Sequence, residues 1–174
     1  MNQEKSRLIA FLGALCLFLS TIEYVIPKPL PFMRLGLANL PILIALYLLD
    51  AKSIFFLVLL KVIAQGFVTG SFFSYIFLFS LLGSFSSGIT MFAFSRISKK
   101  NISPVGISLA GSIANSGMQI LLSKYILFGE AISYVAPVLL VNGTITGILL
   151  GLAGSFFMSK SQWFKKVEVL HENL

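Results

Sequence analysis

The sequence predicts an all-α fold: an integral membrane bundle of six transmembrane helices in a single domain, residues 1–174. Hydrophobic residues make up 57% of the chain and charged residues 11%, whereas soluble domains contain roughly 25% charged residues. This composition excludes a disordered chain, a nucleic-acid-binding domain and an ordinary soluble enzyme. The positions of apolar stretches and basic residues then predict the number of helices and their orientation.

Six apolar stretches approach the roughly 20 residues that an α-helix needs to cross a bilayer. They cover residues 8–25, 35–49, 53–69, 71–94, 104–128 and 132–158. The second stretch is short and contains Pro41, so an irregular or tilted helix is expected there. Only Gly70 and small polar residues separate the third stretch from the fourth, which makes this boundary the least sharply defined.

Lysine and arginine collect on one side of the predicted spans and orient them. Nine of the thirteen basic residues fall in the two tails and two of the connections: Lys5, Arg7, Lys52, Arg96, Lys99, Lys100, Lys160, Lys165 and Lys166. Because cytoplasmic segments of membrane proteins are enriched in Lys and Arg, both termini are predicted to be cytoplasmic. The net charge of +7 is then mainly topological, and no nucleic-acid partner is expected.

Small residues recur at four-residue spacing in several spans, and such rows let membrane helices approach closely. They are Gly143, Gly147, Gly151 and Ser155; Gly106, Ala110 and Ala114; Ser80, Ser84 and Gly88; and Ala10 and Ala14. Each row lies on one helix face. Packing within the bundle is the expected role of most rows, while one row could instead dock a partner protein.

Polar side chains concentrate in the predicted outer half of the membrane. The candidate substrate-binding residues among them are Glu23, Arg34, Asn39, Lys61, Gln65, Tyr75, Asn115, Gln119 and Asn142. Hydrogen bonds between helices would not need to favour one leaflet, whereas a binding cavity open to the outside would. Single members, such as Asn142, remain open to the simpler role of an interhelical hydrogen bond.

Lys61 is the sharpest candidate because it lies near mid-membrane, too deep to reach the interface easily. It needs an anion or a cage of carbonyl oxygens, and its partner could be a bound ligand or Glu23. Three cations, Arg34, Lys61 and Lys124, face one outer anion inside the bundle. This balance favours an anionic or electron-rich small molecule. Tyr75 could stack on a flat ligand or anchor its helix at the interface.

Several catalytic chemistries lack their residues in this sequence. There is no Gly-x4-Gly-Lys-Ser/Thr loop for ATP, and Asp50 is the single aspartate. Paired carboxylates for metal-assisted transfer are therefore not evident. The single Cys16 and single His171 exclude a disulfide framework and a Cys/His metal site. We expect a protein that is not an enzyme and has no cofactor and no metal site.

Residues 29–41 read Pro-Leu-Pro-Phe-Met-Arg-Leu-Gly-Leu-Ala-Asn-Leu-Pro. This stretch resembles the proline-rich first loop and second-helix start of a membrane family called Gx transporter, also labelled heptaprenyl diphosphate synthase component I. The chain is similar in length and number of spans to the substrate-binding S components of energy-coupling factor (ECF) vitamin transporters.

The resemblance implies a small bundle in a prokaryotic cytoplasmic membrane that captures a small, vitamin-like molecule on the outer side. A transmembrane coupling subunit and two cytoplasmic ATPases would drive uptake. Ala10 and Ala14 match the family's docking pattern, and Arg34 and Asn39 match its substrate site. Prenyl diphosphate synthases hold magnesium with Asp-rich motifs, which a single aspartate cannot form. The synthase label therefore implies, as the alternative, a non-catalytic membrane accessory of polyprenyl (heptaprenyl) diphosphate synthesis.

Overall fold

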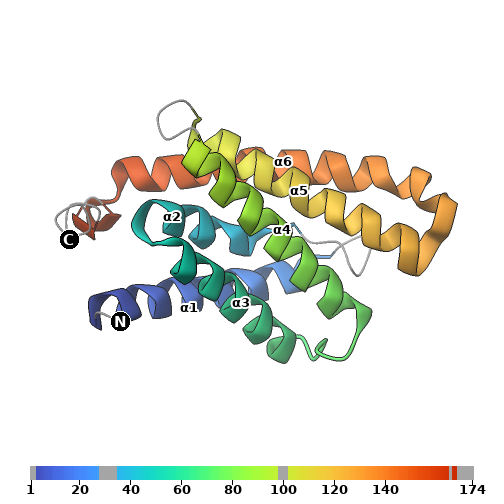
Figure 1. The fold of residues 1–174 in the computed structure, drawn as a ribbon, viewed down its shortest axis with the longest axis horizontal. Coiled ribbons are helices and arrows are strands. Elements are labelled where there is room, and N and C mark those ends of the chain that lie inside the picture. The colour runs from blue at the N-terminus through green and yellow to red at the C-terminus, as the bar shows by residue number, and fades with distance from the viewer. Residues whose placement is uncertain (1–2, 28–34, 98–101, 165, 168–174) are drawn as a thin grey trace.

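A computed structural model describes residues 3–27, 35–97, 102–164 and 166–167 (Figure 1). None of these described residues lies in a β-strand. The elements, in chain order, are α1 (Gln3–Val25), η1 (Leu37–Asn39), α2 (Leu40–Leu48), α3 (Ala51–Val68), α4 (Tyr75–Ile97), α5 (Pro104–Ser123), the π-helical turn η2 (Lys124–Phe128), η3 (Gly129–Ala131) and α6 (Ile132–Lys160). The all-α prediction is thus confirmed for the described residues.

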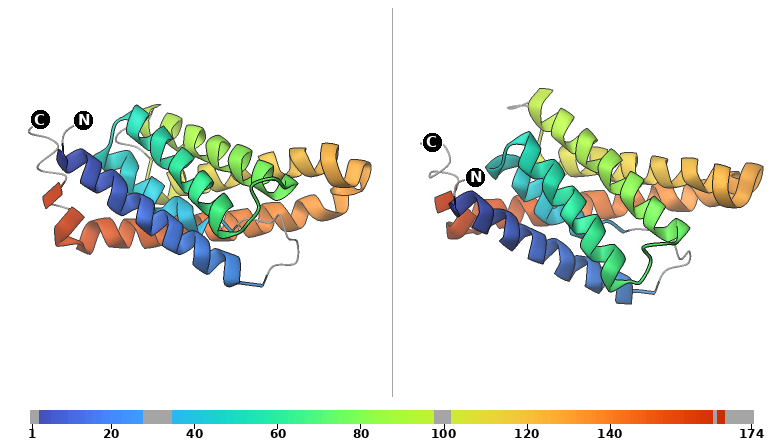
Figure 2. Two further views of the ribbon diagram at one scale, coloured as in Figure 1. Left: turned by 90° about the horizontal axis from the view of Figure 1, so that it is seen from below. Right: turned by 60° about the horizontal axis from the view of Figure 1, so that its bottom comes forward.

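The helices pack side by side in one bundle around the short helix α2. Helices α5 and α6 form an antiparallel hairpin, α4 packs on α5, and α3 lies between α4 and α1 (Figures 1 and 2). The start of α1 and the end of α6 lie at the same end of the bundle in every view. Helix α2 is enclosed by its neighbours, because residues 41–45 are all buried.

Four stretches of the described chain are long and apolar enough to cross a membrane. They are Lys5–Val25, Ala51–Val68, Tyr75–Ile97 and Pro104–Lys160, the last of which contains both α5 and α6. These stretches indicate a multi-pass membrane protein.

The predicted span at residues 35–49 does not form a helix of spanning length. Its first residues form the 3-10 turn η1, and α2 contains only nine residues, which rise about 14 Å. Gly36 explains the late start, because its φ of 85° lies in the left-handed region that a helix cannot include. Pro41 then falls in the first turn of α2, where its missing N–H has no consequence.

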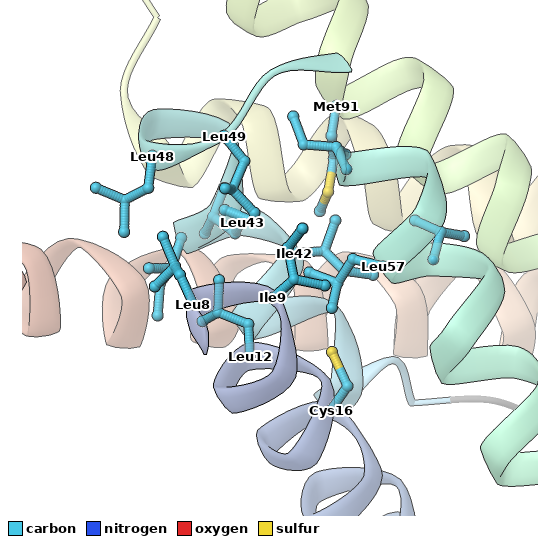
Figure 3. Packing of buried hydrophobic residues seen from close by; sticks show 14 of the residues in the cluster. Leu8, Ile9, Leu12, Cys16, Ile42, Leu43, Leu48, Leu49, Leu57 and Met91 are labelled. Carbon is cyan, nitrogen blue, oxygen red and sulfur yellow. The ribbon is translucent and has the colours of Figure 1, made fainter. Parts of the chain in front are cut away.

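A mainly apolar core occupies the end of the bundle where α1 begins (Figure 3). It joins Leu8, Ile9, Leu12 and Cys16 of α1 to α2, Leu57 of α3 and Met91 of α4. Beyond the end of α6, Phe164 is buried in the same cluster, and the Trp163 ring packs 5.3 Å from the Phe11 ring. From Cys16 onward, the buried positions of α1 turn polar, with Ser20 and Glu23. We call the end of the bundle that contains Ser20 and Glu23 the polar half, although a second apolar cluster forms around Phe79 and Leu139.

The glycine row of α6 packs inside the protein against α5. A Cβ on Gly143 would lie 2.1 Å from Ser116 Oγ, and one on Gly151 would lie 2.5 Å from the Cα of Val105. Gly147 meets Ser112 in the same way. The row therefore sets how closely the two helices approach, as the spacing predicted.

Gly151→Ala should lower the free energy of unfolding by about 1–3 kcal/mol, because the added methyl group meets backbone atoms of α5 that cannot rotate away. Gly117→Ala is the matched control, since a Cβ there meets no atom of the described chain within 4 Å. Unfolding in detergent compares the two variants. Equal stabilities would show that the α5–α6 contact tolerates a side chain.

The connection between α2 and α3 is tied to the start of α1 by an ion pair between Lys5 and Asp50. The hydrogen bond from Lys5, more than the one from Ser53 (2.9 Å), lowers the pKa of Asp50 from 3.8 to about 2. A carboxylate whose pKa falls on folding stabilises the protein above its unfolded pKa and loses that contribution as the pH falls through the folded pKa.

The unmodified protein should therefore lose a small amount of stability as the pH falls from about 4 to about 2. Asp50→Asn should abolish this loss. The contribution is less than about 1 kcal/mol, since the Asp50 side chain is 46% exposed. Thermal unfolding across this range measures it, and Lys5→Met should flatten the same part of the pH profile. A pH profile unchanged in both variants would show that the ion pair does not stabilise the fold.

Candidate functional site

Eight residues from five segments surround one small cavity in the polar half of the bundle. They are Glu23 of α1, Gly36 and Asn39 before α2, Lys61 and Gln65 of α3, Ser80 and Ser84 of α4, and Asn115 of α5. Its free volume is about 10 Å³, which is room for about one water molecule. Five of the nine predicted substrate-binding residues therefore meet at one place.

The Glu23 carboxylate organises the chain segment that leads into α2. Its Oε1 accepts a hydrogen bond from Leu35 N (2.8 Å), and its Oε2 accepts from Gly36 N (3.1 Å) and Leu37 N (2.9 Å). The left-handed φ of Gly36 lets these successive N–H groups converge on one anion. Glu23 is only 2% exposed, so this backbone nest replaces the water that the charge has lost.

The Lys61 ammonium group is held by oxygens from two other segments. Its Nζ donates to Asn39 Oδ1 at 2.7 Å and to Ser84 Oγ at 3.2 Å. Asn39 is fixed in turn, because its Nδ2 donates to Ser87 Oγ at 3.4 Å. Lys61 is only 4% exposed, and a buried charge needs such hydrogen bonds to offset its desolvation. An amide oxygen and a hydroxyl thus form part of the expected cage.

Gln65 and Asn115 complete the cavity from α3 and α5. Gln65 lies one turn beyond Lys61, and its Oε1 accepts from Ser80 Oγ at 3.2 Å. Asn115 reaches the cavity across α4, where the missing side chain of Gly83 leaves room for it. A Cβ on that glycine would lie 2.3 Å from Asn115 Oδ1.

Four other predicted residues are not among the described lining of the cavity. Gln119 is buried one turn beyond Asn115 on α5. Tyr75 is exposed and meets Phe79 edge-on, with the ring centroids 6.2 Å apart. Asn142 lies half-buried on α6, where its buried Nδ2 has no hydrogen-bond partner among the described residues. Arg34 lies outside the described residues.

Lys124, one of the three predicted cations, lies away from the cavity, which agrees with the simpler expectation that its side chain reaches the outer interface. Lys124 lies at the turn between α5 and α6, where its Nζ pairs with Glu130 at 3.2 Å. Both side chains are well exposed there, so Lys124 does not contribute to the cavity. Among the described lining residues, the formal charges of Glu23 and Lys61 balance.

Sequence reasoning missed Gly36, Ser80 and Ser84 as parts of the site. The two serines were interpreted as a small-residue packing row, yet their hydroxyl groups bond Gln65 and Lys61. Their four-residue spacing matches that of Lys61 and Gln65 on α3, which is the signal that could have revealed them. No comparable signal marks Gly36, because its role depends on its backbone conformation.

These features define a multi-pass helical membrane protein with a polar cavity enclosed among its helices. The chain belongs to the heptaprenyl diphosphate synthase component I family, whose sequence model matches residues 12–157. We found no match among curated proteins or among solved structures.

Glu23→Gln should lower the free energy of unfolding by about 2 kcal/mol, because the amide removes one acceptor oxygen and the negative charge from the backbone nest. Glu130→Gln makes the same change in an exposed ion pair and should have little effect. Chemical unfolding in detergent provides the comparison. If both variants unfold alike, Glu23 does not hold the segment before α2.

Proposed function

We propose that this chain is the substrate-capture subunit, or S component, of an ECF-type transporter. It would bind a small, anionic or vitamin-like molecule on the outer side of the membrane. The polar cavity is the observation that carries the proposal. Ionisable residues at membrane depth are costly and commonly mark ligand paths, and here Glu23 and Lys61 are both buried beside a cavity in a strongly apolar chain.

The proposed topology has six crossings, with both termini in the cytoplasm of a prokaryotic cell and α2 as the short crossing. Two observations support it. The start of α1 and the end of α6 lie at the same end of the bundle, and Lys5 and Lys160 are found there. In this proposed orientation the cavity would lie in the outer half of the membrane, since Glu23 is near the far end of α1.

Energy for uptake would come from partners, a transmembrane coupling subunit and two cytoplasmic ATPases, since the sequence contains no ATP-binding loop. The surface proposed to dock the coupling subunit is the α1 face that contains Ala10 and Ala14. Both alanines are exposed. Gly13, on another face of α1, packs against α3, where a Cβ would lie 2.8 Å from Leu60 Cδ2.

The second candidate is a non-catalytic membrane accessory of heptaprenyl diphosphate synthesis, which the name of the family favours. It requires a soluble, Asp-rich synthase subunit that binds this chain. The connection after α4, which begins near the exposed Arg96, is the proposed contact. A pull-down that recovers such a subunit, and no coupling subunit or ATPase, would favour the accessory over the transporter.

Ala14→Leu should prevent co-purification with a coexpressed coupling subunit and its two ATPases, because a larger side chain blocks close helix contact. Ala153→Leu is the matched control on an exposed position of α6 and should assemble normally. Co-purification from membranes measures assembly. Equal assembly of both variants would rule out the α1 face, and failure of the unmodified chain to assemble would contradict the ECF role.

If the proposed function holds, a small molecule co-purifies with the unmodified protein, and Lys61→Met should weaken its binding by about tenfold or more. A hydrogen bond to a charged group contributes roughly 1.5–3 kcal/mol, and 1.4 kcal/mol is a factor of ten. Arg34→Ala should also weaken it. Native mass spectrometry measures the occupancy, with Lys124→Met as the control outside the cavity. Undiminished occupancy in both site variants would contradict a cationic pocket.

A further inference from the structure

Three side chains that line the cavity present oxygens that already accept hydrogen bonds within the protein. Both Glu23 oxygens accept from backbone N–H groups. Asn39 Oδ1 accepts from Lys61, and Gln65 Oε1 accepts from Ser80. Asn115 Oδ1 is directed toward Gly83. A ligand that offers only N–H donors would therefore have to share an oxygen that already accepts a hydrogen bond, or reach Asn115 Oδ1, which packs against Gly83.

Two side-chain amide nitrogens at the cavity, unlike these oxygens, have no hydrogen-bond partner in the described part of the chain. Gln65 Nε2 and Asn115 Nδ2 donate no hydrogen bond within the described part of the chain. Their side chains are only 4% and 6% exposed, and both line the cavity. A donor that has no acceptor within the protein favours a ligand that supplies one. The two groups come from different helices, so one ligand group between them would be contacted from two sides.

We infer that the cavity recognises a planar group with oxygen acceptors, either a carboxylate or a pair of carbonyl oxygens, and that Gln65 and Asn115 set this specificity. The inference rests on the proposed function, in which this cavity binds the ligand. Each carboxamide donates an N–H to one oxygen of the group. An ammonium group of the same size is disfavoured, because it meets two more donors and because the Asn39 and Gln65 oxygens already accept hydrogen bonds.

The size of the cavity defines suitable probes. Its free volume of about 10 Å³ accepts a group little larger than a water molecule unless side chains rotate. The Gln65 and Asn115 side chains have bonds that can rotate, and two other lining residues, Gly36 and Ser80, are small. Formate, formamide and methylammonium are therefore appropriate, since they present a carboxylate, a carbonyl and a cation on the smallest possible frame.

The test uses the full chain in detergent with ¹⁵N-labelled Asn and Gln side chains, titrated with each probe to molar concentration. The side-chain amide signals of Gln65 and Asn115 should shift with formate, with formamide or with both, at least tenfold more tightly than with methylammonium. Response to formate alone identifies a carboxylate ligand, and response to formamide identifies carbonyl oxygens. Preference for methylammonium, or no shift with formate and formamide, would overturn the inference.

Isosteric variants separate recognition from folding. Gln65→Glu and Asn115→Asp replace the donating NH₂ group by an oxygen and should reverse the preference toward methylammonium, an outcome that a merely structural role would not produce. Gln162→Glu makes the same change at an exposed position beyond α6 and should keep the preference for oxygen acceptors. Reversal in neither site variant, with both folded as judged by unfolding, would also overturn the inference.

The outcome is distinguishable from a failure of the transporter proposal. If the chain assembles with a coupling subunit but prefers methylammonium, the ECF role is supported and the proposed ligand class is wrong. A chain that prefers formate or formamide but finds no coupling subunit keeps the ligand class and loses the ECF role.

Discussion

The buried ammonium group of Lys61 is the interaction on which the polar half of the bundle depends. Its hydrogen bonds to Asn39 and Ser84 connect α3 to the start of α2 and to α4. An ion at 4% exposure is tolerated only while such partners stay in place. The same requirement fixes Asn39, and Asn39 ends the segment whose backbone N–H groups are held by Glu23. One buried charge thus positions three elements around the cavity.

Side-chain periodicity predicted part of this site. Lys61 and Gln65 share a face of α3 because they are one turn apart. The apolar composition of the chain likewise predicted membrane helices. The backbone nest around Glu23 was not predictable, since it depends on the left-handed conformation of Gly36. The conformation of Gly36 also explains why α2 starts late and is short. The contact between Lys124 and Glu130 also depends on the local turn that brings the two side chains together.

The two halves of the bundle suit different tasks. The end where α1 begins is closed by an apolar core that includes Phe164 from beyond α6, whereas the other half contains the cavity and its donors. Close contact through glycines packs α6 against α5, the helix that contributes Asn115 to the cavity.

A double-mutant cycle between Lys61 and Asn39 tests the organising role of the buried ammonium most directly. Unfolding would be measured for the unmodified chain, Lys61→Met, Asn39→Leu and the double variant. We expect a coupling energy of about 1.5–3 kcal/mol, because each single variant leaves the other partner buried without its hydrogen bond. Additive effects within about 0.5 kcal/mol would show that the two residues do not depend on each other, which would contradict the account.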